Sequence, residues 1–320
     1  MSINTYEFGE CIRHGRPIMD EALIEYAEKN EKLYIISPDM MRAGFPKFMA
    51  AHPERHINVG IAETCAVDVA SGMAAEGFLP VVYGMSAFLS MRSYEAVRTF
   101  VGYQNHNVKF IGCNTGVSMG VLGSTHYAME DLSLIKSIPG MTLISPGDPD
   151  QTAKAFYAAC DIEGPVYIRM ANGKNESAVY KEEYDYKIGK GITITEGKDC
   201  AIIATGVMVS YALAAVKELE KKGIYVTLID MHTIKPIDVE LIGKTAAEIG
   251  KIITVEDHFI HGGLGSSVTD TIMELGIPCK VKKLGIPDMF PGFGSFHELR
   301  AHMGYDTIDI INYVKTILAL

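Results

Sequence analysis

The sequence has little cysteine and no long apolar segment. Its 320 residues include six widely spaced cysteines with no CxxC pair, which argues against a zinc cluster or a disulfide framework and predicts buried thiols in a reducing compartment. No apolar run reaches the length of about 18 residues typical of a membrane span, and the first residues lack the apolar core of a signal peptide. We therefore expect a soluble, cytoplasmic protein.

Basic residues are in the minority, and two phosphate-binding motifs are missing. Lys and Arg number 29 against 39 Asp and Glu, a net charge of −10, so we expect neither nucleic acid nor a membrane as partner. No GxGxxG follows the first predicted strand, and GxxxxGK[ST] occurs nowhere. Rossmann-type dinucleotide binding and P-loop chemistry therefore lack support.

The first half of the chain alternates short apolar runs with longer amphipathic stretches. Apolar runs of this length are typical of parallel strands buried on both faces, and their alternation with helices indicates βαβ units. Asp148 is the predicted cap of the last helix in this half. The predicted strands are 33–36, 80–83, 108–112 and 141–145, and the predicted helices are 19–29, 62–76, 94–104 and 150–160.

The pattern breaks at residues 174–190, which are charged and rich in tyrosine and show no period. Such a segment is typical of an inter-domain linker on the surface. We predict two doubly wound α/β domains, residues 1–175 and a smaller one at 192–320, joined by a linker at 176–191. In the second domain the predicted strands are 199–204, 225–229, 251–255 and 279–284, and the predicted helices are 209–221, 238–247 and 266–275.

Three local motifs each allow two interpretations. Glu63 begins a helix of small residues and is either a proton-transfer group in apolar surroundings or a helix-start acid favoured by the dipole. His126, in a loop before a helix, is either an acid–base group or a structural residue. The glycines of 262–265 either hold an anion with their backbone N–H groups or permit tight packing, and we favour packing.

The aromatic and charged side chains near these motifs also allow two interpretations each. Phe88, Met91 and Tyr94 either line a flat apolar pocket or belong to the core, which is the default. Arg169 ends a strand and either clamps a phosphate or sulfonate oxygen or pairs with an acid. For the neighbouring pair at 130–131, two acids in a first helical turn, we predict a solvated position.

Taken in order, the motifs resemble those of one family, the transketolases. The resemblance covers nearly the whole chain, but the family's GDG motif with its following asparagine, which holds the cofactor diphosphate and a divalent metal, is missing from this sequence. It implies the C-terminal subunit of a split transketolase, active only with an N-terminal partner subunit. The motifs are 56–63, 72–77, Tyr83 with Phe88 and Tyr94, 123–131 and 145–148 for the pyrimidine-binding domain, and 164–169 and 255–265 for the rest of the C-terminal half.

The resemblance implies thiamine diphosphate as the cofactor, with a metal, Mg or Ca, held by the partner subunit and none by this chain. Glu63 would share a proton with N1′ of the aminopyrimidine. Phe88, Met91 and Tyr94 match positions around that ring, although many transketolases have an aromatic residue where Met91 stands. Asp39 matches an aspartate near the cofactor and the entrance of the active site.

The implied reaction transfers a two-carbon glycolaldehyde unit from a ketose to an aldose. His126 matches a histidine that handles protons on substrate oxygens, and Arg169 and Arg16 match residues that grip the terminal anion. Leu122 stands where the family has an acid that recognises a donor hydroxyl, and Asn114 where it has a histidine. Because a lost hydroxyl contact is costly, we expect a different ketose: one with a phosphate or sulfonate, or a branched or deoxy sugar.

Two other interpretations remain open. The chain also resembles deoxyxylulose-phosphate synthases and the β subunits of 2-oxoacid dehydrogenases, although the run at 124–131 favours a transketolase. A non-catalytic scaffold subunit is the alternative from another class. For the assembly the resemblance implies an α2β2 particle, with the small-residue helix at 62–75 suited to its interface.

Overall fold

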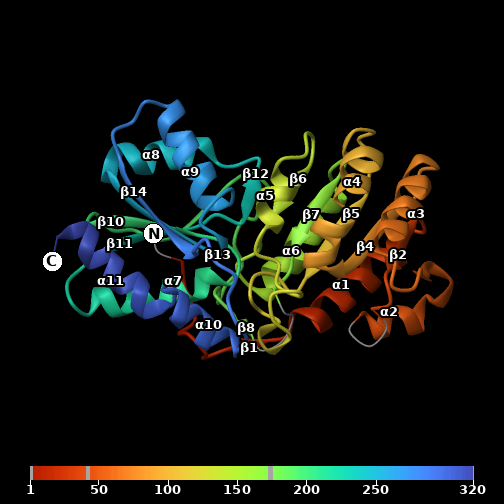
Figure 1. Ribbon diagram of the computed structural model, residues 1–320, viewed down its shortest axis with the longest axis horizontal. Helices are drawn as coiled ribbons and strands as arrows, with labels where there is room; N and C mark the ends of the chain where they lie inside the picture. The colour runs from red at the N-terminus through yellow and green to blue at the C-terminus, as the bar shows by residue number, and fades with distance from the viewer. Residues whose placement is uncertain (1–2, 41–43, 172–175, 320) are drawn as a thin grey trace.

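The computed structural model describes residues 3–40, 44–171 and 176–319. It consists of two α/β units, each built on its own mainly parallel sheet and set side by side along the long axis of the molecule (Figure 1). The predicted fold class, two doubly wound domains, is confirmed.

The first sheet has seven strands in the order β12-β6-β7-β5-β4-β2-β3. All neighbours are parallel except the edge strand β12, which runs antiparallel to β6. Its interior strands are apolar on both faces, as the sequence pattern predicts. The strands are β2 (Leu33–Ser37), β3 (His56–Asn58), β4 (Leu79–Met85), β5 (Lys109–Cys113), β6 (Thr142–Ile144), β7 (Val166–Arg169) and β12 (Thr233–Lys235).

Helices cover both faces of this sheet. Helices α1 (Gly15–Lys29), α2 (Pro46–Ala51) and α6 (Pro149–Cys160) share one apolar core, and Asp148 caps α6 as predicted by accepting from the backbone N–H of Gln151 at 2.8 Å. The predicted helix 94–104 is instead a short α-helix followed by a π-helix. On the opposite face lie α3 (Glu63–Ala75), the π-helices η2 (Phe88–Arg92) and η3 (Val97–Gly102), α4 (Tyr94–Ala96) and α5 (Asp131–Lys136).

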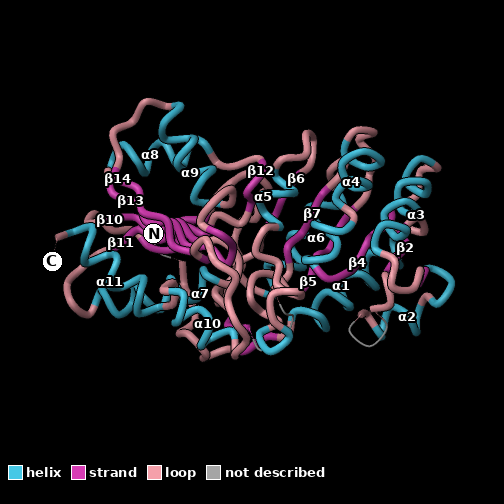
Figure 2. The backbone as a smooth tube through the Cα atoms, viewed as in Figure 1, coloured by secondary structure: helices cyan, strands magenta, loops and turns pink. Residues whose placement is uncertain are grey.

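The second sheet has five strands in the order β14-β13-β10-β11-β9, with β9 the antiparallel edge strand. Figure 2 shows these strands in magenta between two layers of helices: α8 and α9 on one face, α7 and α11 on the other. The two last helices, α10 and α11, are not among the predicted elements. The bounds are β9 (Ile192–Thr195), β10 (Cys200–Ala204), β11 (Val226–Asp230), β13 (Lys251–Phe259), β14 (Lys280–Ile286), α7 (Met208–Glu220), α8 (Val239–Ile249), α9 (Leu264–Glu274), α10 (Phe296–Met303) and α11 (Thr307–Leu318).

The two units are interlocked. Strand β12 belongs to the second unit by sequence but extends the first sheet, where Thr233 pairs with Ile144. Conversely, the backbone N–H of Ile3 donates to Ile194 in the second unit. One buried apolar cluster includes residues of both units. The second unit is therefore part of the support of the first.

The predicted linker is more firmly anchored than its polarity suggests. Strand β8 (Glu176–Ser177) pairs with β1 (Ile12–Arg13), Val179 is fully buried, and the Tyr180 hydroxyl donates to Asp230 of β11 at 2.6 Å. Residues 177–180 are therefore buried, contrary to the expectation of a surface segment, whereas residues 181–183, 185, 187 and 190 are exposed as expected. The predicted boundary at residue 175 lies outside the described residues.

Two predicted absences concern cysteine and membrane spans. All six cysteines are free thiols; Cys113 and Cys200 are buried, but Cys65 is exposed. Among the helices of the described residues, none combines the length and apolar character needed to cross a bilayer.

Candidate active site

The predicted site residues follow the carboxyl ends of four neighbouring strands. Asp39 comes after β2, Glu63 after β3, Phe88 after β4 and Asn114 after β5. The carboxyl ends of parallel strands meet at one edge of a sheet, which is where open α/β sheets bind ligands. The topology therefore brings together residues that lie up to 75 positions apart, from 39 to 114.

Glu63 is a buried carboxylate with one exposed partner. It is the first residue of α3, where a negative charge is favoured by the helix dipole. Its side chain is 4% exposed, and Oε2 accepts from Nη1 of Arg92 at 3.0 Å, while the Arg92 side chain is 55% exposed. Sequence reasoning missed Arg92, because the pairing depends on the π-helical turn η2 that follows β4.

An unbroken row of contacts leads from Glu63 to His126. The guanidinium of Arg92 lies 4.7 Å from the centre of the Phe88 ring, and that ring meets the His126 ring edge-on at 5.5 Å between centroids. Thr125 Oγ1 is 2.9 Å from Nδ1 of His126. The structure thus places the two predicted catalytic residues on either side of Phe88.

The other two predicted ring contacts differ from each other. Met91 is exposed beside Arg92, so its thioether is open to a ligand or a partner. Tyr94 packs against the buried core, and its hydroxyl lies 2.6 Å from Ser137 Oγ at the end of α5. The core interpretation therefore accounts for much of Tyr94.

Backbone strain marks the loops after β2 and β5. Asp39 and Asn114 have φ values of 52° and 59°, a left-handed conformation that few residues other than glycine adopt and that gathers at functional sites. Asn58 Oδ1 accepts from the backbone of both Asp39 and Gly60, which ties the loops before Glu63 together. Asn114 is buried, and its Oδ1 accepts from Nη2 of Arg16 at 3.4 Å.

A loop of the second unit reaches the segment that carries Leu122. Leu122 is exposed at the end of a 3₁₀ turn. Phe293, 80% exposed, lies directly on Gly123: a Cβ there would be 2.8 Å from the phenyl Cδ1. Ser124 Oγ donates to the carbonyl of Pro291 at 2.9 Å. Sequence reasoning missed Phe293, since about 170 positions separate it from this loop.

The structure corrects the substrate-gripping role predicted for Arg169. Its side chain is buried, Nε donates to Asp131 at 2.8 Å, and Nη2 donates to the carbonyls of Asp257 at 2.6 Å and Ala128 at 3.4 Å. Asp131, predicted to be solvated, is buried for the same reason. Asp257 in turn pairs with the buried Arg300 at 2.7 Å. Arg169 is therefore committed to the interface between the two units.

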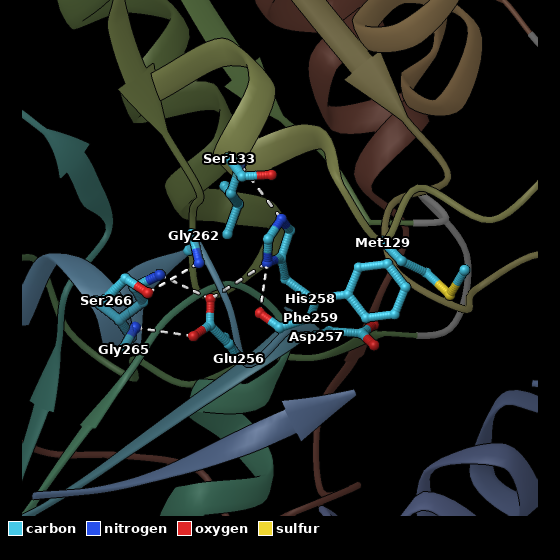
Figure 3. A network of polar contacts seen from close by, with 12 residues as sticks. Met129, Ser133, Glu256, Asp257, His258, Phe259, Gly262, Gly265 and Ser266 are labelled. Atoms are coloured by element: carbon cyan, nitrogen blue, oxygen red, sulfur yellow. Dashed lines mark hydrogen bonds and ion pairs between the residues drawn. The ribbon is translucent and has the colours of Figure 1, made fainter. Parts of the chain in front are cut away.

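The glycine-rich turn before α9 serves packing, as favoured from the sequence. The carboxylate of Glu256 accepts from the backbone N–H of Leu264 at 2.7 Å and of Gly265 at 2.8 Å (Figure 3). A Cβ at Gly263 would lie 1.9 Å from Glu256 Oε2, so only glycine fits there. The group held by this turn is the chain's own carboxyl, that of Glu256, and burial raises its pKa to about 7.

Across residues 3–40, 44–171 and 176–319, no three His, Cys, Asp or Glu side chains are placed so that they could hold an ion together.

Comparisons with known proteins divide the chain into the same two units by sequence, with β12, which extends the first sheet, in the second matched region. A family model described as the transketolase pyrimidine-binding domain matches residues 15–176, and one described as the transketolase C-terminal domain matches residues 189–310. The two matched regions meet at the anchored segment between the units.

Several curated proteins are similar over most of the chain. An apulose-4-phosphate transketolase subunit of Phocaeicola vulgatus is 35% identical over 91% of this chain and 93% of its own length. A 6-deoxy-6-sulfo-D-fructose transketolase subunit of a Clostridium species is also 35% identical, over 91% and 90%. A 1-deoxy-D-xylulose-5-phosphate synthase of Geobacter sulfurreducens is 38% identical over 94% of this chain but only 48% of its own length.

The fold also matches a solved structure. A split-gene transketolase, described as an inactive β4 tetramer, superposes with a TM-score of 0.85 and 33% identity, covering 96% of this chain and 99% of that one.

Proposed function

Because the chain belongs to the transketolase family, we propose that it is the pyrimidine-binding subunit of a two-chain, thiamine-diphosphate-dependent transketolase. The reaction is transfer of a two-carbon glycolaldehyde unit from an anionic ketose to an aldose. The observation that carries this proposal is the buried carboxylate of Glu63 beside Phe88 and the exposed Arg92, at the carboxyl edge of the first sheet.

The residues at this edge fit an aminopyrimidine ring. Glu63 offers a shielded carboxylate to a ring nitrogen, while Phe88 and the exposed Met91 offer apolar and polarizable surfaces to the faces of the ring. Glu63 holds and exchanges a proton at that nitrogen. When bound, thiamine diphosphate supplies the electron sink for breaking the carbon–carbon bond. Asp39, in its left-handed loop, stands nearest the entrance.

A second polypeptide completes the site. Large apolar side chains are exposed around Glu63 and His126, among them Ile61, Met91 and Val121. Exposed apolar groups gathered at one place are typical of an interface. We propose that the partner is the N-terminal transketolase subunit, that it brings the diphosphate and metal site, with Mg or Ca, and that the assembly is α2β2. The relatives named as transketolase subunits support a partner of this kind.

The substrate is an anionic ketose. With Arg169 committed elsewhere, Arg16 is the predicted cation that remains, and its buried Nε has no hydrogen-bond partner among the described residues. A buried, unpartnered N–H favours an incoming acceptor. Leu122 and Phe293 are exposed apolar side chains at the loop that leads to His126. They suit a substrate that has no hydroxyl group at this place. The two subunit relatives are named for a phosphorylated and a sulfonated ketose.

A deoxyxylulose-phosphate-synthase-like reaction is the second candidate, favoured by the 38% identity to the Geobacter protein. The two reactions differ in their donor, since the synthase-like reaction consumes pyruvate. The chain is therefore assayed alone and with its partner, against a panel of ketose phosphates, a sulfo-ketose and pyruvate. We expect ketose cleavage only when both chains are present. Pyruvate turnover without ketose cleavage would overturn the transketolase assignment.

A further inference from the structure

Strand β13 ends in three buried polar residues, Glu256, Asp257 and His258. Polar groups this deeply buried need hydrogen-bond partners. Glu256 finds its partners within its own unit, at the start of α9. The other two reach the first unit: the carbonyl of Asp257 accepts from Arg169, and His258 faces Ser133 of α5 (Figure 3).

The contacts of His258 favour the tautomer with its hydrogen on Nδ1. Nδ1 lies 2.7 Å from the carbonyl oxygen of Phe259, which can only accept, so Nδ1 carries the hydrogen. Nε2 is then an acceptor, and the backbone N–H of Ser133 donates to it at 3.3 Å. Burial lowers the pKa of His258 to about 4, which keeps the imidazole neutral near pH 7.

Ser133 is the third residue of α5, and the first N–H groups of a helix have no partner inside it. Glu130, at the N-cap position, provides no side-chain cap to this helix. The cap comes instead from the other unit. Next to it, the backbone N–H of Phe259 donates to the carbonyl of Met129 at 3.0 Å. Both contacts hold the short segment that joins His126 to α5.

We propose that His258 is a positioning residue for His126. Its neutral imidazole caps α5 from the second unit and, together with Phe259, fixes the backbone of residues 126–131. This inference rests on the proposed function, because it assigns the second unit the task of holding the acid–base segment of the first. An acid–base group displaced by a fraction of an ångström loses much of its effect on rate.

Two amide substitutions test whether His258 must accept a hydrogen bond from Ser133 or need only be a polar residue. The amide of Gln reaches as far as Nε2, whereas the amide of Asn reaches only as far as Nδ1, so His258→Gln keeps the acceptor for Ser133 and His258→Asn loses it. The exposed His261, three positions away, gives a matched control, His261→Asn. Each variant is assayed with its partner subunit for kcat and KM, and amide exchange at Ser133 is followed in the chain alone.

For His258→Asn we expect kcat to fall by about 10- to 100-fold with KM for the ketose nearly unchanged, and faster exchange at Ser133. His258→Gln should recover most of kcat, and His261→Asn should match wild type. Equal losses in the Asn and Gln variants, or unchanged exchange at Ser133, would overturn the inference.

Two measurements still test the role of His258 if a variant does not fold or the enzyme shows no activity. In the wild-type chain, nitrogen-15 NMR should find the His258 hydrogen on Nδ1; a hydrogen on Nε2 would contradict the cap whether or not His258→Asn folds. If the wild-type complex cleaves no ketose, the proposed function fails, whereas the exchange and NMR results still decide whether His258 caps α5.

Discussion

Two of the arginine–carboxylate pairs in this chain are nearly equal in length but lie in opposite surroundings. Arg169 and Asp131 meet at 2.8 Å with side chains 1% and 0% exposed, between the two units. Arg92 and Glu63 meet at 3.0 Å, but Arg92 is 55% exposed. The first pair is enclosed by the chain itself, and the second is half open at the edge of a sheet.

The groups around each pair differ in the same way: those around Arg169 are enclosed by the chain, and those around Arg92 include exposed side chains. The interdomain seam, defined by Asp131, Arg169, Asp257, His258 and Arg300, is dense with hydrogen bonds inside the chain. At the open edge, Ile61, two positions before Glu63, and Met91, next to Arg92 in the chain, are exposed apolar residues. Polar residues enclosed by their own chain support structure, whereas a buried carboxylate beside an open apolar surface calls for another molecule. The same residue types therefore differ in role according to what encloses them.

The largest expected effect is at the open edge. Glu63→Gln removes the proton-transfer group while keeping its shape, and we expect the activity of the assembled enzyme to fall by about 10²- to 10⁴-fold. Because the Arg92 pair is half exposed, the free energy of unfolding should change by less than about 1 kcal/mol. Activity within a few-fold of wild type would favour a non-catalytic scaffold.

In the interdomain seam, we expect a substitution to lower the free energy of unfolding. Arg169→Met leaves Asp131 buried without its cation, so we expect a loss of about 3–5 kcal/mol in the free energy of unfolding, measured by urea titration. The matched variant Arg92→Met removes a cation that is 55% exposed, and we expect a smaller loss than for Arg169→Met. If Arg169→Met instead kept its stability and raised the KM for the ketose, the gripping role would be restored and the comparison would break.

The third effect is a pH dependence in the second unit, next to the seam. Burial raises the pKa of Glu256 from 4.5 to about 7, so the folded state holds a proton that the unfolded chain has released. Its contribution is complete below about pH 4.5 and is lost as the pH rises through 7, about 3 kcal/mol in all.

Urea unfolding at pH 5 and pH 8 measures this loss against Glu256→Gln, which has no carboxyl to titrate. His258, whose Nδ1 lies 3.7 Å from Oε2 of Glu256, titrates with the opposite sign because burial lowers its pKa to about 4. The comparison is therefore repeated with His258→Gln in both proteins. The same pH dependence in wild type and variant would show that Glu256 is ionised throughout.

Much of the fold follows from the sequence because its signals are local. Apolar runs and capping residues, such as Asp148 before α6, predict the strands and helices of the first unit. Strand β12 has no such signal, since its place at the edge of the other unit's sheet depends on tertiary packing. The burial of Tyr180 cannot be predicted for the same reason: its hydroxyl donates to Asp230, far away in the chain.

At the site, spacing and type locate residues but do not assign their surroundings. Glu63 stands out because it begins a helix of small residues, and it does lie at the open edge. Arg169 ends a strand in the same way as a ligand-binding arginine would, and only the structure reveals Asp131 and Asp257 around it. Arg92 could not be predicted, because its pairing depends on the π-helical turn.

The central claim is that Glu63 faces a cofactor whose other end is bound by another chain. A crystal structure of the assembled complex with thiamine diphosphate tests it most directly. We expect the Glu63 carboxylate within hydrogen-bonding distance of N1′ of the aminopyrimidine, with the diphosphate and its metal on the partner subunit. A diphosphate bound within this chain, or a Glu63 side chain turned to solvent, would contradict it.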